Sequence, residues 1–186
     1  QEAVEFGRRM AEVGWYVVTG AGSGIMEGAH VGAGRAMSMG LNIMLPFEQS
    51  ANEVIRGDEK LVNMKYFFTR KLMFVKECDA VVCLPGGFGT LDEGPGGTYW
   101  QDFHKFIDKH LMGGAMISSV DFSLYKVCDS VDATVDEIMH FYRVFHSMRF
   151  VRKQLVFRLQ RHLPEAVVQK INADFTDLLA KGEFVQ

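Results

Sequence analysis

The stretch that decides the fold is residues 79–93, which read Asp79-Ala-Val-Val-Cys-Leu-Pro-Gly-Gly-Phe-Gly-Thr-Leu-Asp-Glu93. Its first part, 79–84, is an apolar run rich in β-branched residues, which predicts a buried strand. A glycine-rich turn follows, and after a strand of an open α/β sheet such a turn offers backbone N–H groups to a phosphate. The end of the stretch adds the hydroxyl of Thr90 and the carboxylates of Asp92 and Glu93. A phosphate cradle beside a carboxylate predicts a nucleotide site that can also perform chemistry.

Strand and helix patterns alternate upstream of this stretch. After the end of a helix at 1–13, we expect strand 15–19, glycine turn 20–24, helix 25–35, strand 41–45 and helix 61–77. This alternation predicts an α/β fold with a doubly wound, Rossmann-like parallel sheet. Ligands of such sheets bind beyond the carboxyl ends of the strands, so we expect both glycine turns to line one crevice.

The alternation fails after Glu93, because Gly94-Pro-Gly-Gly97 follows at once and a helix over 99–111 comes with no strand between. We interpret this failure as the absence of a helix and a strand near 94–95. Because the sequence starts within a helix at Gln1, we also expect that a first strand is absent. The remaining expected helices are 134–146, 149–162 and 164–180. The sequence thus predicts a single domain over 1–186, with extra C-terminal helices from about 134 to 186.

Composition narrows the class of protein. The 186 residues are 48% hydrophobic, which suits one domain with a full core. The net charge of -3 gives no indication of a polyanionic partner, so we expect no binding to nucleic acid. No apolar run reaches the ~18 residues that span a membrane, and no signal peptide is visible, so we expect a soluble cytoplasmic protein without a membrane partner. The three cysteines lack CxxC spacing and are expected to be reduced, mostly buried thiols. The histidines lack metal-binding spacing, and we expect neither a metal site nor a cofactor.

Three motifs occur in a characteristic order: Gly20-Ala-Gly-Ser-Gly-Ile-Met-Glu-Gly-Ala29, Arg70-Lys71 and Pro85-Gly-Gly-Phe-Gly-Thr-Leu-Asp-Glu93. Together they resemble the LOG (Lonely Guy) family, long labelled "lysine decarboxylase-like", over residues 1 to about 115. The stretches 41–49 and 66–71 and the added C-terminal helices resemble the longer, type II branch. In that branch the segment after the glutamate motif supplies a helix and a strand, in agreement with the expected gap.

The resemblance implies a phosphoribohydrolase, which cleaves the N-glycosidic bond of a nucleoside 5′-monophosphate to the free base and ribose 5-phosphate. AMP and cytokinin riboside 5′-monophosphates are the implied substrates, and the implied catalytic pair is Arg70 and Glu93. The positions implied to bind substrate are Gly22, Ser23, Gly24, Met26, Lys71, Gly86, Gly87, Gly89 and Thr90. Family members form dimers, so a homo-oligomer, dimeric or larger, is expected.

Glu93 fits the chemistry that the resemblance implies. Cleavage of an N-glycosidic bond passes through an oxocarbenium-like transition state, whose positive charge a carboxylate stabilises. A carboxylate can also orient or deprotonate the attacking water. A pyridoxal phosphate decarboxylase would instead need a Schiff-base lysine and a partner for the pyridine nitrogen. Lys71 is the lysine beside the motifs and belongs to the Arg-Lys pair, so that activity is not expected.

Several residues keep a second interpretation. Without the motif, Arg70 would be read as part of a surface ion pair. Met26 fits a core position as well as a contact with the base. The polar residues Glu48, Gln49 and Asn52 could reach the base or ribose, or could stabilise a turn. The glycines of 20–24 do not match GxGxxG, which disfavours NAD.

The function also keeps an alternative, which is a nucleotide- or cofactor-binding carrier or sensor without turnover. The phosphate-binding turn alone would suffice for it. A carboxylate at Glu93 gains nothing for anion binding, so its presence favours the enzyme.

Overall fold

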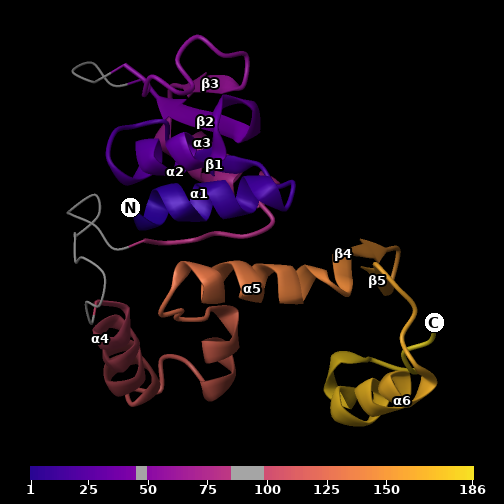
Figure 1. Cartoon of the computed structure of the whole chain (residues 1–186). Coiled ribbons are helices and arrows are strands. Elements are labelled where there is room, and N and C mark those ends of the chain that lie inside the picture. The colour runs from indigo at the N-terminus through magenta and orange to yellow at the C-terminus, as the bar shows by residue number, and fades with distance from the viewer. Residues whose placement is uncertain (45–49, 85–98) are drawn as a thin grey trace. The chain divides into compact units, whose positions relative to one another are not determined.

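The computed structural model describes residues 1–44, 50–84 and 99–186. The chain divides into two compact units, Gln1–Val135 and Asp136–Gln186 (Figure 1).

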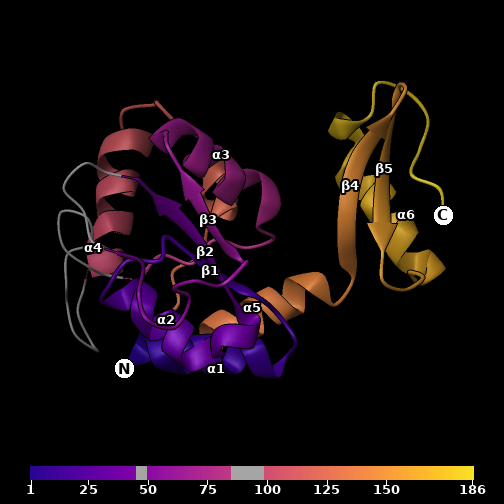
Figure 2. The same ribbon diagram turned by 90° about the horizontal axis from the view of Figure 1, so that it is seen from above.

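The first unit contains a parallel sheet in the order β1-β2-β3. Its strands are β1 (Val17–Thr19), β2 (Ser38–Ile43) and β3 (Leu61–Met64). Val17 pairs with Ser38, and Gly40 pairs with Leu61. Figure 2 shows α1 (Glu2–Glu12) and α2 (Ile25–Ala33) on one side of the sheet and α3 (Phe67–Glu77) on the other. This arrangement confirms the predicted α/β class with a parallel, doubly wound sheet.

Helices α1 and α2 approach each other backbone to backbone. A Cβ atom added at Gly7 would lie 2.1 Å from the Ala29 carbonyl oxygen, and one at Gly32 would lie 1.8 Å from the Val4 carbonyl oxygen. Neither position has room for a side chain, because real Cβ contacts lie well beyond these distances. Buried small residues, Ala3, Ala29 and Ala33, line the same contact. The close approach therefore fixes α2, whose first turn carries the glycine motif.

A small core cluster lies beneath the glycine turn. Ala21, Ala51 and Ile55 are at most 6% exposed and pack together with Leu61 of β3. A Cβ atom at Gly40 would lie 3.0 Å from the Cβ of Ala21. The segment after β2 therefore packs back against the turn that follows β1.

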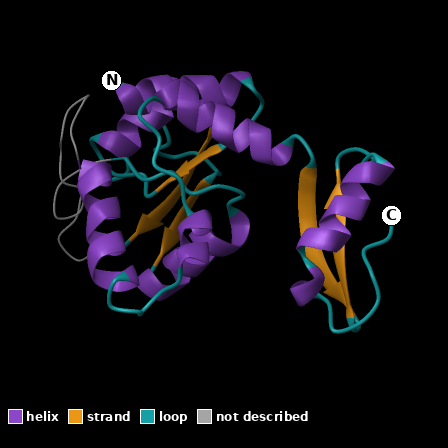
Figure 3. Cartoon of the chain, turned by 90° about the horizontal axis from the view of Figure 1, so that it is seen from below, coloured by secondary structure: helices purple, strands orange, loops and turns teal. Residues whose placement is uncertain are grey.

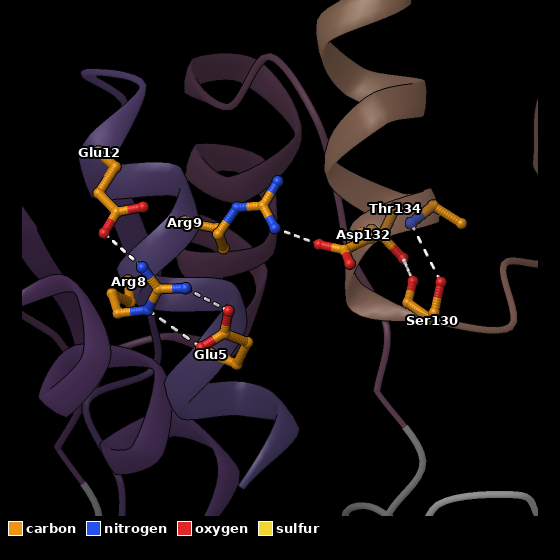
Figure 4. A network of polar contacts seen from close by, with 8 residues as sticks. Glu5, Arg8, Arg9, Glu12, Ser130, Asp132 and Thr134 are labelled. Atoms are coloured by element: carbon orange, nitrogen blue, oxygen red, sulfur yellow. Dashed lines mark hydrogen bonds and ion pairs between the residues drawn. The ribbon is translucent and has the colours of Figure 1, made fainter.

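From Tyr99 on, the regular elements of the first unit are helical. Helix α4 (Tyr99–Phe106) continues into a π-helical segment, Ile107–Met112, and a 3-10 segment, Ser119–Leu124, precedes α5 (Val131–Tyr142). Figure 4 shows the first turn of α5 joined to α1 by an ion pair between Asp132 and Arg9. On α1 itself, Arg8 pairs with Glu5 and Glu12. Exposed pairs of this kind contribute little to stability, because water screens the charges.

The second unit holds an antiparallel hairpin and a helix (Figure 3). Strands β4 (Phe145–Val151) and β5 (Gln154–Leu159) are joined at Arg152-Lys153, and Arg152 has a φ of 55°. Helix α6 (Glu165–Asp174) follows Pro164, with a 3-10 turn at Thr176–Leu178. The Asn172 side chain accepts a hydrogen bond from the Phe184 N–H and donates one to its carbonyl, which ties the last residues to α6.

Three expected elements need correction. The helix expected over 149–162 is wrong, because β4 and β5 occupy this region, where aromatic and β-branched residues pair across the hairpin. The expected helix 61–77 is split, since 61–64 pairs with β2 and the helix begins only at Phe67. The strand expected over 79–84 is also wrong, because these residues form no strand.

The failure of 79–84 has a physical reason. An apolar, β-branched run becomes a strand only where a sheet edge satisfies its backbone groups. None of the described strands pairs with this run, and Val81 is 70% exposed.

Cys83 is exposed and Cys78 and Cys128 are half-buried, so the expectation of mostly buried thiols is wrong as well.

The remaining expected helices are confirmed with shifted ends. The helix at 25–35 ends at Ala33, and the helix expected over 134–146 runs from Val131 to Tyr142. Within residues 1–44, 50–84 and 99–186, no helix combines the length and apolar character that crossing a membrane requires.

Candidate functional site

The glycine turn at 20–24 follows the carboxyl end of β1 and leads into α2. Ala21 adopts a φ of 60°, and Gly24, the residue before α2, adopts a φ of 71°. Positive φ suits glycine but is uncommon for alanine, so the surroundings must hold Ala21 in place. The Ala21 N–H donates to Thr19 Oγ1 at 3.0 Å, and the Ala21 carbonyl accepts from the Asn52 N–H at 2.8 Å. The Asn52 side-chain amide donates to the Gly22 carbonyl at 3.1 Å.

His30 lies beneath the turn and has no exposed surface. Its Nε2 is 3.1 Å from the Met39 carbonyl oxygen and 3.0 Å from Thr19 Oγ1. Because a carbonyl only accepts, Nε2 carries a hydrogen. Burial lowers the pKa of His30 below its ordinary value, which favours the neutral ring. Nδ1 then accepts from the Asn52 amide nitrogen at 3.2 Å, a shorter contact than the 3.5 Å to the amide oxygen.

We call Thr19, His30 and Asn52 the turn-support network. Its members come from three separate segments, namely β1, α2 and the segment between β2 and β3. Asn52 is 6% exposed and uses its polar groups on the turn. Of the two interpretations of Asn52, the structure therefore favours the turn role.

Arg70 of α3 lies beside the same turn. A Cβ atom at Gly20 would lie 3.4 Å from Arg70 Nη1 and 2.9 Å from the sulfur of Met26. One at Gly22 would lie 2.8 Å from Met26 Cε. The absence of side chains at Gly20 and Gly22 thus lets Met26 and the guanidinium approach the backbone. Two motifs that are about fifty residues apart in the sequence meet here.

The surroundings of Arg70 match its candidate role better than a plain surface ion pair. Its side chain is half-buried, and its guanidinium carbon is 5.4 Å from the centre of the Phe67 ring. Arg70 takes part in none of the ion pairs between described residues. A cation beside the N-terminal end of α2 makes this corner suitable for an anion.

The other predicted site residues differ in what is known of them. Ser23 and Gly24 are exposed on the turn, and Met26 is 39% exposed, so it is not a core residue. Lys71 is exposed on α3 next to Arg70. The positions that lie outside the described residues are Glu48, Gln49, Gly86, Gly87, Gly89, Thr90, Asp92 and Glu93. The part of the chain that is described contains no group of three or more His, Cys, Asp or Glu side chains that could hold a metal ion.

Sequence reasoning missed His30. The available signal was its place four residues after Met26 in α2, on the same side as the buried Ala29 and Ala33. A polar ring on the face of a helix that packs on a sheet needs buried partners. Those partners, Met39 and Asn52, lie on other elements and could not be identified from local spacing.

Comparisons with known proteins agree with the motifs. Residues 23–94 match the family described as "Possible lysine decarboxylase". One similar protein is the "Probable cytokinin riboside 5'-monophosphate phosphoribohydrolase LOGL5" of Oryza sativa subsp. japonica, which is 34% identical over 96 residues, 49% of this chain and 37% of that protein. Another, "Probable cytokinin riboside 5'-monophosphate phosphoribohydrolase LOG4" of the same plant, is 31% identical over 96 residues, 49% of this chain and 40% of that protein. The match thus spans less than half the length of these curated relatives. Over the segment that the matches cover, this chain is thus similar to proteins of the LOG family.

Proposed function

We propose that this protein hydrolyses the N-glycosidic bond of a nucleoside 5′-monophosphate, either AMP or a cytokinin riboside 5′-monophosphate. The observation that carries the proposal is that the Arg70 guanidinium approaches the glycine turn at Gly20. The Met26 sulfur lies beside the same glycine. The names of the two rice relatives support the same reaction class. The products are the free base and ribose 5-phosphate.

Arg70 supplies the positive charge that an anionic substrate needs. A guanidinium presents several N–H donors in a fixed plane and stays charged at any physiological pH. From its place beside Gly20 it can hold ribose or phosphate oxygens, or orient the carboxylate of Glu93. The neighbouring turn residues Gly22, Ser23 and Gly24 line the nucleotide, with Lys71 close to the site.

Glu93 is assigned to the ribose and the water from the motif alone, since it lies outside the described residues. The bond between C1′ and the base nitrogen breaks, and the bonding electrons leave with the base. The carboxylate stabilises the positive charge on the ribose and takes a proton from water, whose oxygen bonds to C1′. The base nitrogen gains a proton, so that the sum of the reaction is the addition of water. Gly86, Gly87, Gly89 and Thr90 are proposed to hold the 5′-phosphate with backbone N–H groups and one hydroxyl.

Met26 is proposed to contact the base. Its thioether covers Gly20 and Gly22, and 39% of the residue remains exposed beside the turn. A flexible, polarisable side chain suits an aromatic base and tolerates changes in its substituents. A few apolar contacts of this kind decide between adenine and a prenylated adenine.

The test is an incubation with AMP and, separately, with a cytokinin riboside 5′-monophosphate, in which free base and ribose 5-phosphate are separated by chromatography. The parent protein is expected to release both products. Glu93→Ala is expected to release neither while still binding the nucleotide, because the phosphate contacts do not involve its carboxylate.

Two results would reject the enzyme. Near-normal turnover by Glu93→Ala would remove the carboxylate from the mechanism. Binding of both nucleotides by the parent protein without any release would favour the carrier or sensor. The extra C-terminal segment would then be the place to look for a response to the nucleotide.

A further inference from the structure

The support of the glycine turn runs through a fully buried histidine, His30. We propose that Thr19, His30 and Asn52, the turn-support network, are positioning residues that hold the turn at 20–24 in the shape that the nucleotide site requires. This proposal rests on the proposed function, in which the turn at 20–24 lines the nucleotide. No member of the network is assigned a contact with the substrate.

The turn needs such support because its backbone is not a low-energy shape. Ala21 has a φ of 60° in a position with no exposed surface. Conformations of this kind cost free energy and persist only where the surroundings enforce them. The Ala21 N–H, which points into the protein, finds its acceptor in Thr19 Oγ1 at 3.0 Å. Without that hydroxyl, a buried donor would be left without an acceptor.

The network also has a fixed direction of hydrogen bonding. Asn52 has two amide hydrogens, and one is used by the Gly22 carbonyl at 3.1 Å. The other points to His30 Nδ1 at 3.2 Å, which can accept only if the ring hydrogen resides on Nε2. Nε2 in turn donates to the Met39 carbonyl of β2 at 3.1 Å. The tautomer of His30 therefore sets the orientation of the Asn52 amide, which holds the Gly22 carbonyl.

The position of the turn matters for the site because Arg70 and Met26 lie very close to Gly20 and Gly22. A Cβ atom at Gly20 would be 3.4 Å from Arg70 Nη1, and one at Gly22 would be 2.8 Å from Met26 Cε. A shift of the turn by about 1 Å would change both contacts, and misplacement of that size can cost about a hundredfold in rate. Loss of the network is therefore expected to act on catalysis even where the fold survives.

The experiment compares Thr19→Val with Thr19→Ser. Valine keeps the shape of threonine and removes the hydroxyl, whereas serine keeps the hydroxyl and removes the methyl group. We expect kcat/KM for AMP to fall about tenfold or more in Thr19→Val and to stay within about twofold of the parent in Thr19→Ser. Hydrogen exchange at the Ala21 amide is expected to accelerate about tenfold or more in Thr19→Val alone.

A matched control separates positioning from loss of stability. Val135→Ala removes packing at a residue of α5 that is 2% exposed and makes none of the hydrogen bonds of the turn. It is expected to lower the Tm of the protein without changing KM for AMP. If Val135→Ala at equal Tm loss reduced kcat/KM as much as Thr19→Val, the positioning role would be overturned.

A second measurement needs neither turnover nor a folded variant. The side-chain ¹⁵N chemical shifts of His30 in the parent protein at neutral pH are expected to show a neutral ring with its hydrogen on Nε2. A charged ring, or a hydrogen on Nδ1, would overturn the proposed direction of the network.

Failure of this proposal can be told apart from failure of the proposed function. A parent protein that cleaves no nucleotide would reject the function, whereas Ala21 exchange and the His30 shifts need no substrate. Unchanged Ala21 exchange in Thr19→Val would overturn the positioning role whether or not AMP is cleaved.

Discussion

The glycine turn of the first unit and the hairpin of the second unit differ in the size of the side chains from which they are built. The turn is built from small residues over buried polar groups, so its surface is bare backbone with Arg70 and Met26 beside it. The hairpin is built from large side chains that pair across two strands, and Phe150 remains 73% exposed. A ligand can approach the backbone N–H groups most closely where side chains are absent. Of the two regions, the turn is therefore the one whose backbone is open to a ligand, as the proposed nucleotide site requires.

The largest expected effect comes from adding a side chain where the backbones of α1 and α2 meet. Gly32→Ala places a Cβ atom 1.8 Å from the Val4 carbonyl oxygen, so the helices must separate. The expected loss is about 3 kcal/mol or more in the free energy of unfolding. The measurement is denaturant unfolding followed by circular dichroism.

Gly28→Ala is the matched control for Gly32→Ala. Both glycines lie inside α2 and gain the same helix propensity, but a Cβ atom at Gly28 would lie 3.3 Å from the Ala3 side chain, with Val4 atoms at 3.6 and 3.8 Å. The expected change is within about 1 kcal/mol, since the tight contact is offset by propensity. Equal losses in the two variants would contradict the backbone-to-backbone packing.

A smaller effect is expected from pH. Burial lowers the pKa of His30 in the folded protein, while the unfolded chain has the ordinary value of about 6.5. Below that value the unfolded state binds more protons, so the contribution is complete above about pH 6.5 and is lost as pH falls towards the lowered pKa. Among the described residues, the polar groups that contact the His30 ring belong to Thr19, Met39 and Asn52, and none of them is charged.

Thermal unfolding between about pH 5 and 6.5 checks this dependence. His30→Gln is the comparison variant, because it cannot titrate. The Tm of the parent is expected to fall more steeply over this range than that of His30→Gln. Parallel slopes for the two proteins would show that His30 does not carry the pH dependence.

The sequence predicted the elements whose pattern is local. The strand before the glycine turn, helix α2 and strand β2 were recognised because each has its own apolar or small-residue pattern. The sequence of 149–162 predicts a helix, whereas these residues belong to a hairpin. Whether such a segment forms a helix or a strand is decided by its pairing with a neighbouring strand, which the local sequence does not show. The run 79–84 shows the converse, since its residues are strand-like but form no strand with the described strands.

The candidate site was predicted as far as the motifs reach. Arg70 and the glycine turn were assigned to one site by resemblance, and their proximity at Gly20 agrees with that assignment. The turn-support network could not be predicted, since His30 and Asn52 are 22 residues apart and their contact depends on the tertiary fold. The roles of Gly86, Thr90 and Glu93 stay predictions.

The most direct test of the central claim is the rate of base release from AMP, and from a cytokinin riboside 5′-monophosphate, by Arg70→Ala. Lys76→Ala, an exposed cation on the same helix, and Arg158→Ala, an exposed cation of the hairpin, are the matched controls. We expect Arg70→Ala to lose about a hundredfold to a thousandfold in kcat/KM, the size expected for removal of an electrostatic contact in the transition state. The two controls should keep the rate of the parent. Equal rates in all four proteins would contradict the claim that the corner formed by Arg70 and the glycine turn is the active site.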